Sequence, residues 1–232
     1  MGGRYWVWVV ARLLVAVAIV AWAASYMGTG SGEKEFQKTL DAMKQVRSFR
    51  VAYTATQGAN HQELLWEIDC NQDLWHHQSH YVQTTSENAP TDFLQDEITA
   101  NGKQYERMNG GSWTQSKYYT ANAKAFCNNL SQGNDTNVLP PIATMIKRGI
   151  IQKGDKRTVN GVRCREWLVT MKGGMSGLEH DKVCLGLEDH LPYEVTVDYM
   201  QSRASFSDYN THLQIDLPEV ALQNTSATAG SN

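Results

Sequence analysis

A period-two alternation of apolar and polar residues recurs along most of this 232-residue chain. In one run Phe49, Val51 and Tyr53 occupy every second position, and residues 193–199 repeat the pattern. Successive residues of a strand point to opposite faces of a sheet, so each run predicts a strand with one buried face. The chain is therefore predicted to form a large antiparallel sheet, and something must cover its apolar face.

Two predicted helices can provide that cover. In residues 33–46 the apolar side chains recur every three or four positions and line one helix face. Residues 142–148 begin after a proline and end before a glycine, which is the usual punctuation of a helix. Residues 120–130 predict a further short helix. The Asn-Gly pairs at 101–102 and 109–110 predict tight hairpins, and residues 203–209 and 212–217 predict the last strands. The residues thus indicate an α+β fold.

The first 26 residues predict an export segment. Residues 13–24 are continuously apolar, and Ala21-Trp22-Ala23 is typical of a cleavage site. A cleaved signal peptide and an N-terminal membrane anchor over 5–26, with Arg12 inside it, both remain open. Either one places the rest of the chain outside the membrane. We expect a linker at 27–32, one domain at 33–220 and a disordered tail at 221–232.

The charge balance narrows the class of partner. Without the first 32 residues, which include Arg4 and Arg12, the chain has 19 basic and 24 acidic side chains, a formal charge of −5. This balance argues against nucleic acid or an anionic lipid surface as the main partner. No catalytic constellation or cofactor motif is evident, so we expect a non-catalytic protein without a cofactor.

Four cysteines follow the export segment, and in an oxidising compartment they predict disulfides. Cys164 and Cys184 lie ten residues on either side of Gly174, in a hairpin that would place them directly opposite each other. We predict Cys164–Cys184 and, by elimination, Cys70–Cys127. Zinc is the alternative, but the chain has no C-x-x-C spacing.

Three histidines form the pattern H-H-x-x-H at 76–80. On a strand, His76 and His80 share a face but lie about 13 Å apart, which is too far for one metal ion. On a helix the same spacing would suit a metal. The surrounding residues favour a strand, so we predict exposed strand histidines and no metal.

Three stretches follow the order of elements of a known family. They read FQKTLDAMKQVRSFRVAYTATQG, then ITANGKQYERMNGGSWTQ, then GDKRTVNGVRCREWLVT followed by LEDHLPYEVTV. This order resembles the LolA-like superfamily of periplasmic lipoprotein carriers and the related mycobacterial glycolipid-carrier lipoproteins. The resemblance implies an unclosed, curved antiparallel β-barrel, or half-barrel, covered by the N-terminal helix and short inserted helices. In the family, an apolar cavity between sheet and helices takes acyl chains.

Two functions remain open on the sequence. The first is an exported envelope protein, periplasmic or anchored in the inner membrane, that binds a lipid or acylated protein under a movable lid at 142–148. The alternative is a protein-interaction or sensor module of the envelope with a filled core. Under the first function the apolar faces of the strands line a cavity. Under the second they pack together as an ordinary core. The predicted lining residues are Val51, Tyr53, Trp66, Ile68, Tyr105, Trp113, Ile142, Met145, Ile146, Val195 and Val197.

Overall fold

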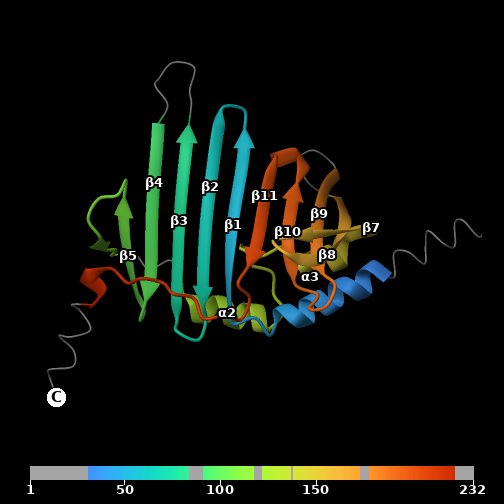
Figure 1. Cartoon of the computed structure of the whole chain (residues 1–232), viewed down its shortest axis with the longest axis horizontal. Helices are drawn as coiled ribbons and strands as arrows, with labels where there is room; N and C mark the ends of the chain where they lie inside the picture. Colours follow the sequence, from blue (N-terminus) through green and yellow to red (C-terminus); the bar gives the residue numbers. More distant parts are fainter. Residues whose placement is uncertain (1–30, 84–90, 118–121, 137, 173–177, 223–232) are drawn as a thin grey trace, which may run out of the picture.

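Eleven strands form one antiparallel sheet in the computed structural model, which describes residues 31–83, 91–117, 122–136, 138–172 and 178–222 (Figure 1). The strands are β1 (Ser48–Gln57), β2 (Asn60–Asp69), β3 (Leu74–Gln83), β4 (Thr91–Ala100), β5 (Lys103–Met108), β6 (Thr114–Gln115), β7 (Gly149–Val159), β8 (Val162–Lys172), β9 (Leu178–Gly186), β10 (Pro192–Val197) and β11 (Ser202–Ser207).

The strand order is that of a meander with one long-range pairing. Strands that follow each other within β1–β6 and within β7–β11 are neighbours, and β1 pairs with β11 to join the two halves. Among the described strands, β6 and β7 lie at opposite ends of the sheet and do not pair. The fold is therefore an α+β curved half-barrel that is not closed, as predicted.

Both predicted Asn-Gly turns are present, but only the first closes a tight hairpin, because Glu106 pairs with Thr114 and leaves residues 107–113 between the paired positions. Asn101 and Gly102 have φ angles of 52° and 71°, and Asn109 and Gly110 have 49° and 70°. Ala100 pairs with Lys103, so the first turn consists of these two residues alone. Positive φ at both positions is what a type I′ hairpin turn requires, and Asn and Gly adopt it most readily.

Helices cover one face of the sheet, which we call the helix face. They are the N-terminal helix (31–43), α2 (Ala123–Ser131) and α3 (Ile142–Arg148), and a 3-10 turn, η1 (Asp198–Met200), joins β10 to β11. Phe36 of the N-terminal helix, Phe126 of α2 and Ile142 of α3 lie in one core cluster with Phe49 and Phe206 of the sheet. In Figure 1 the N-terminal helix and α2 cross the lower ends of the central strands.

The opposite face, which we call the outer face, has a smaller apolar cluster. Leu213 and Ile215 pack there against Leu74, Ile98 and Ala100. Residues 212–217, expected to form the last strand, have no regular secondary structure. The strand prediction was wrong because any extended segment that lies on a sheet buries every second side chain, whether or not its backbone pairs.

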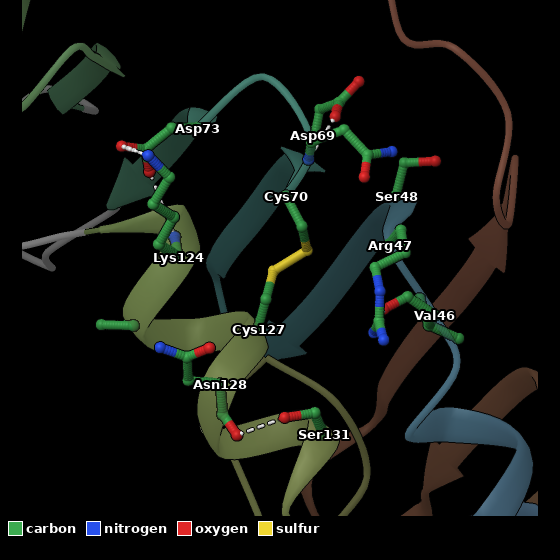
Figure 2. The surroundings of a disulfide bond; sticks show 12 residues. Val46, Arg47, Ser48, Asp69, Cys70, Asp73, Lys124, Cys127, Asn128 and Ser131 are labelled. Carbon is green, nitrogen blue, oxygen red and sulfur yellow. Dashed lines mark hydrogen bonds and ion pairs between the residues drawn. A yellow bond between two sulfur atoms is a disulfide. The ribbon is translucent and has the colours of Figure 1, made fainter.

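Both predicted disulfides are present. Cys70, at the end of β2, is joined to Cys127 of α2, and Figure 2 shows this bond beside the ion pair of Asp73 and Lys124. Cys164 and Cys184 join β8 to β9. The register argument for that pair was wrong by two residues, because Cys164 lies opposite Gly186 and Cys184 lies opposite Glu166. The bond is therefore diagonal, with a Cα–Cα distance of 5.6 Å.

The predicted segment boundaries stay predictions. The export segment at 1–26 and residues 223–232 lie outside the described residues. Residues 31 and 32, expected in the linker, and residues 221 and 222, expected in the disordered tail, are helical. Among the helices that the structure describes, none has both the length and the apolar character needed to cross a bilayer.

Candidate ligand groove

A hollow of about 430 Å³ lies on the helix face, where β1, β2, β10 and β11 run side by side (Figure 1). We call this hollow the groove. Strand residues form its floor, and the loop 138–140 between α2 and α3 forms one wall. The lining residues are Val51, Tyr53, Gln62, Leu64, Trp66, Val138, Leu139, Pro140, Val195, Ala204 and Phe206.

Strand register brings these side chains together. Val51 of β1 faces Trp66 of β2, and Tyr53 faces Ala204 of β11. Ala204 in turn faces Val195 of β10. An alanine between a tyrosine and a valine leaves the floor of the sheet low at this point. A larger side chain there would fill the space, so Ala204 is a principal reason that the groove is open.

Hydrogen bonds fix the loop that borders the groove. The backbone N–H of Leu139 donates to Thr136 Oγ1 at 3.2 Å. Asp135 accepts from the backbone N–H groups of Ala143 and Thr144 at 2.9 and 3.0 Å, and so satisfies donors in the first turn of α3. The loop is thus held at both ends, and its tip places buried apolar side chains against the groove.

Aromatic rings form the wall on the β2 side. The Tyr53 ring meets the Trp66 ring edge to face, with centroids 6.4 Å apart. Trp66 in turn stacks on His77 of β3, with centroids 5.2 Å apart and planes 14° apart. Such contacts hold large rings in one orientation. The groove therefore has a flat, ordered wall.

The structure divides the predicted lining residues into groups. Those that line the groove are Val51, Tyr53, Trp66 and Val195. Ile68, Ile142 and Met145 are fully buried in the core, and Ile146 packs against it. Val197 lies at the end of β10, outside the lining. The loop before α3, rather than α3 itself, borders the hollow.

Tyr105 and Trp113 do not join the others. Tyr105 faces Ile98 of β4, which belongs to the outer-face cluster, and Trp113 packs against the same cluster. Neighbouring cross-strand partners share a face of the sheet, so Tyr105 is on the outer face. The prediction of one lining shared by all eleven residues was therefore wrong for these two.

Sequence reasoning missed several lining residues. Leu64 lies two positions before Trp66, and Ala204 and Phe206 alternate on β11, so the period-two pattern could have found them. The loop residues 138–140 gave no periodic signal, because a loop has none. Their role follows only from how α2 and α3 are placed.

A line of alternating charges crosses the outer face from β1 to β5. Arg50 Nε donates to Glu67 Oε1 at 2.8 Å, and His76 Nδ1 lies 2.6 Å from Glu67 Oε2. His76 Nε2 lies 2.7 Å from Asp96 Oδ1, and Arg107 Nε donates to Asp96 Oδ2 at 2.8 Å. Glu67 and Asp96 are almost fully buried, so these bonds satisfy charges that would otherwise be costly.

This arrangement explains the histidine pattern. His76 and His80 share the outer face of β3, as predicted, but His76 is not exposed, since its side chain is 16% accessible. The pKa of His76 is lowered by burial, but hydrogen bonds to Asp96 and Glu67 outweigh this and raise it to about 9. In the described residues no group of three or more His, Cys, Asp or Glu side chains is placed to hold a metal.

Comparisons with known proteins found likeness in structure only. No family model matches the sequence, and no curated protein matches it. Among solved structures, MucB is 13% identical over 82% of this chain and 62% of its own, with a TM-score of 0.43. The chain thus spans about three fifths of MucB. The Pseudomonas aeruginosa MucA/MucB complex has a chain that is 12% identical over 80% of this chain and 59% of its own, with a TM-score of 0.41.

LolA-like proteins are also among the structural neighbours. A LolA superfamily protein from Nitrosomonas europaea is 10% identical over 82% of this chain and 96% of its own, with a TM-score of 0.27. A putative outer membrane lipoprotein-sorting protein domain from Vibrio parahaemolyticus is 9% identical over 80% and 95%, with a TM-score of 0.29. Likeness at this level says nothing about what this chain binds.

Proposed function

We propose that this protein is a non-catalytic, exported protein of the cell envelope that binds an acyl chain of a lipid or acylated protein in the groove. The observation that supports this most strongly is the open volume of about 430 Å³ between the sheet and the loop 138–140. A ligand pocket of the usual kind has a volume of this order, with apolar walls and few polar groups.

The chemistry of the lining suits a hydrocarbon. Its described residues include no Lys, Arg, Asp or Glu, and the members that carry a polar group are Gln62, Tyr53 and, through its indole N–H, Trp66. Burial of apolar surface is favourable by about 25 cal/mol per Å², so about 200 Å² of hydrocarbon gives about 5 kcal/mol before the costs of association. Neither a charged group nor a metal is needed for such binding.

The alternative function, a protein-interaction or sensor module, was expected to have a filled core. The core beneath α2 and α3 is indeed dense, with Phe36, Ile142 and Met145 fully buried. The groove lies beside that core, and no side chain of the described residues fills it. Its open volume therefore favours the acyl-binding function.

Filling the groove tests the proposal. Ala204→Phe places a ring where the floor is low, and we expect it to weaken binding of the apolar dye phenylnaphthylamine at least tenfold, which corresponds to about 1.4 kcal/mol. Dye fluorescence measures the dissociation constant, and displacement of the dye by lauric acid shows that the same site takes an acyl chain.

The matched control is Ala52→Phe. Ala52 is exposed on the outer face of β1, next to Tyr53, so the same substitution there adds a ring that cannot reach the groove. We expect this variant to bind the dye as the unmodified protein does. Equal binding by both variants, or equal loss in both, contradicts the proposal.

A further inference from the structure

A second hollow adjoins the groove. It has a volume of about 360 Å³ and lies at the hairpin end of β1 and β2. Tyr53 and Gln62 line both hollows, so the two are neighbours along the same strands. We call the second hollow the outer compartment. The name refers to its place at the hairpin end of the strands; the compartment continues the groove on the helix face and is not on the outer face. Its lining residues are Tyr53, Ala55, Gln57, Asn60, His61, Gln62, Tyr81 and Met200.

Polarity changes along the two strands. On β1 the residues that face the helices run Val51, Tyr53, Ala55 and Gln57. From Val51 to Gln57 is six residues, or about 20 Å of strand. On β2, the residues that pair with these four run from Trp66 at the apolar end to Asn60 at the amide end. The combined trough is therefore apolar at one end and rich in amide groups at the other.

Charge is nearly absent from the outer compartment. Among the described residues that line it, His61 is the one titratable base; its Nε2 lies 3.1 Å from Glu63 Oε1 and its Nδ1 lies 3.2 Å from Thr56 Oγ1. Hydrogen bonds from His61 and then from His80 lower the pKa of Glu63, which therefore remains a carboxylate at neutral pH.

These features select against an anionic group. A phosphate or carboxylate in the outer compartment would meet no unpaired cation among the described residues, and the Glu63 carboxylate lies beside His61. Burying an unpaired charge is costly, whereas amide and phenol groups pair with hydroxyl, amide or ester groups at no such cost. Met200, which is 43% exposed, adds an apolar contact at the rim.

We propose that the outer compartment binds an uncharged, hydrogen-bonding headgroup of the amphiphile whose acyl chain lies in the groove. The inference rests on the function proposed above. Tyr53 lies at the boundary of the two hollows, where its ring touches the chain and its hydroxyl can reach the headgroup. The ligand class is thus a lipid with a hydroxyl, amide or ester headgroup rather than a phosphate one.

Four amphiphiles with the same twelve-carbon chain test this inference. The protein is purified in the form that is exported by cells expressing the full chain. Isothermal titration calorimetry, at ligand concentrations below the critical micelle concentration, then measures the dissociation constants of dodecyl maltoside, a dodecyl polyoxyethylene ether, dodecyl phosphate and dodecylphosphocholine. We expect the two uncharged compounds to bind at least tenfold more tightly than dodecyl phosphate. Comparison of the maltoside, which carries many hydroxyl groups, with the ether shows whether the site recognises hydroxyl groups or only requires an uncharged headgroup.

Two variants of one exposed residue complete the test. Gln57 is exposed beside the hairpin turn, so its replacement leaves the core intact. Gln57→Arg supplies the missing cation and is expected to strengthen dodecyl phosphate binding about tenfold, and Gln57→Glu is expected not to do so. If all four compounds bind alike and Gln57→Arg changes nothing, the headgroup inference is overturned while the acyl groove stands. If none of the four binds, the proposed function itself fails.

Discussion

Replacing His76 by leucine is expected to lower the free energy of unfolding by about 3 kcal/mol. The substitution leaves Glu67 and Asp96 buried without the imidazolium that lies between them, and removing one partner of a buried ion pair costs about 3–5 kcal/mol. The value here falls at the low end because Arg50 and Arg107 still contact the two carboxylates. Urea unfolding at neutral pH measures the change.

His80→Leu is the matched control. His80 is on the same strand and face and also lies between two carboxylates, Glu63 and Asp92, but its side chain is 36% exposed. Exposed ion pairs contribute little, so we expect a change within about 0.5 kcal/mol. Equal losses in the two variants would contradict the view that burial makes the His76 line important.

The pH dependence of stability follows from the same site. The pKa of folded His76 is raised from 6.5 to about 9, and each pKa unit corresponds to about 1.4 kcal/mol. The His76 contribution is therefore fully present below about pH 6.5 and is lost as the pH rises through about 9. The difference between the unmodified protein and His76→Leu should shrink between pH 7 and pH 10 accordingly.

Removing the Cys70–Cys127 disulfide is the second large effect. Its partners are 57 residues apart in sequence. In the loop-entropy model, closing a loop of that length reduces the conformational entropy of the unfolded chain and so raises its free energy by about 4 kcal/mol. The bond also holds α2, whose Phe126 ring packs on Phe49 and Trp75 at centroid distances of 5.8 and 5.4 Å. We expect Cys70→Ala/Cys127→Ala to cost about 2–4 kcal/mol.

The other disulfide supplies the comparison. Cys164 and Cys184 are 20 residues apart and join strands that already pair along their length. The double alanine variant of that pair should therefore lose less stability in the same urea experiment. A loss as large as that of the first pair would contradict the role given to α2 and its disulfide bond.

The sequence predicted the individual elements better than their assembly. Strands and Asn-Gly turns are local, so period two and positive-φ residues identified them. The pairing of β1 with β11 joins residues about 150 positions apart, such as Val51 and Phe206, and no local pattern encodes it. The C-terminal segment 212–217 shows the opposite error, because its alternation is real but its backbone does not pair.

The groove was only partly predictable for a physical reason. Val51 and Ile68 have the same period-two pattern, yet Val51 lines the hollow and Ile68 is buried in the core. The difference is made by Ala204, on a strand that is distant in sequence but adjacent in the sheet, and by a loop without periodicity. Similarly, the prediction that His76 is exposed was wrong. The two carboxylates that enclose it come from β2 and β4, so the sequence around His76 alone does not reveal them.

The most direct test of the central claim is to extract the exported protein with organic solvent and to identify lipids by mass spectrometry. The account predicts about one acyl-bearing molecule per protein, uncharged in its headgroup, and its loss in Ala204→Phe but not in Ala52→Phe. Recovery of no lipid from the unmodified protein, or of equal amounts from both variants, would contradict it.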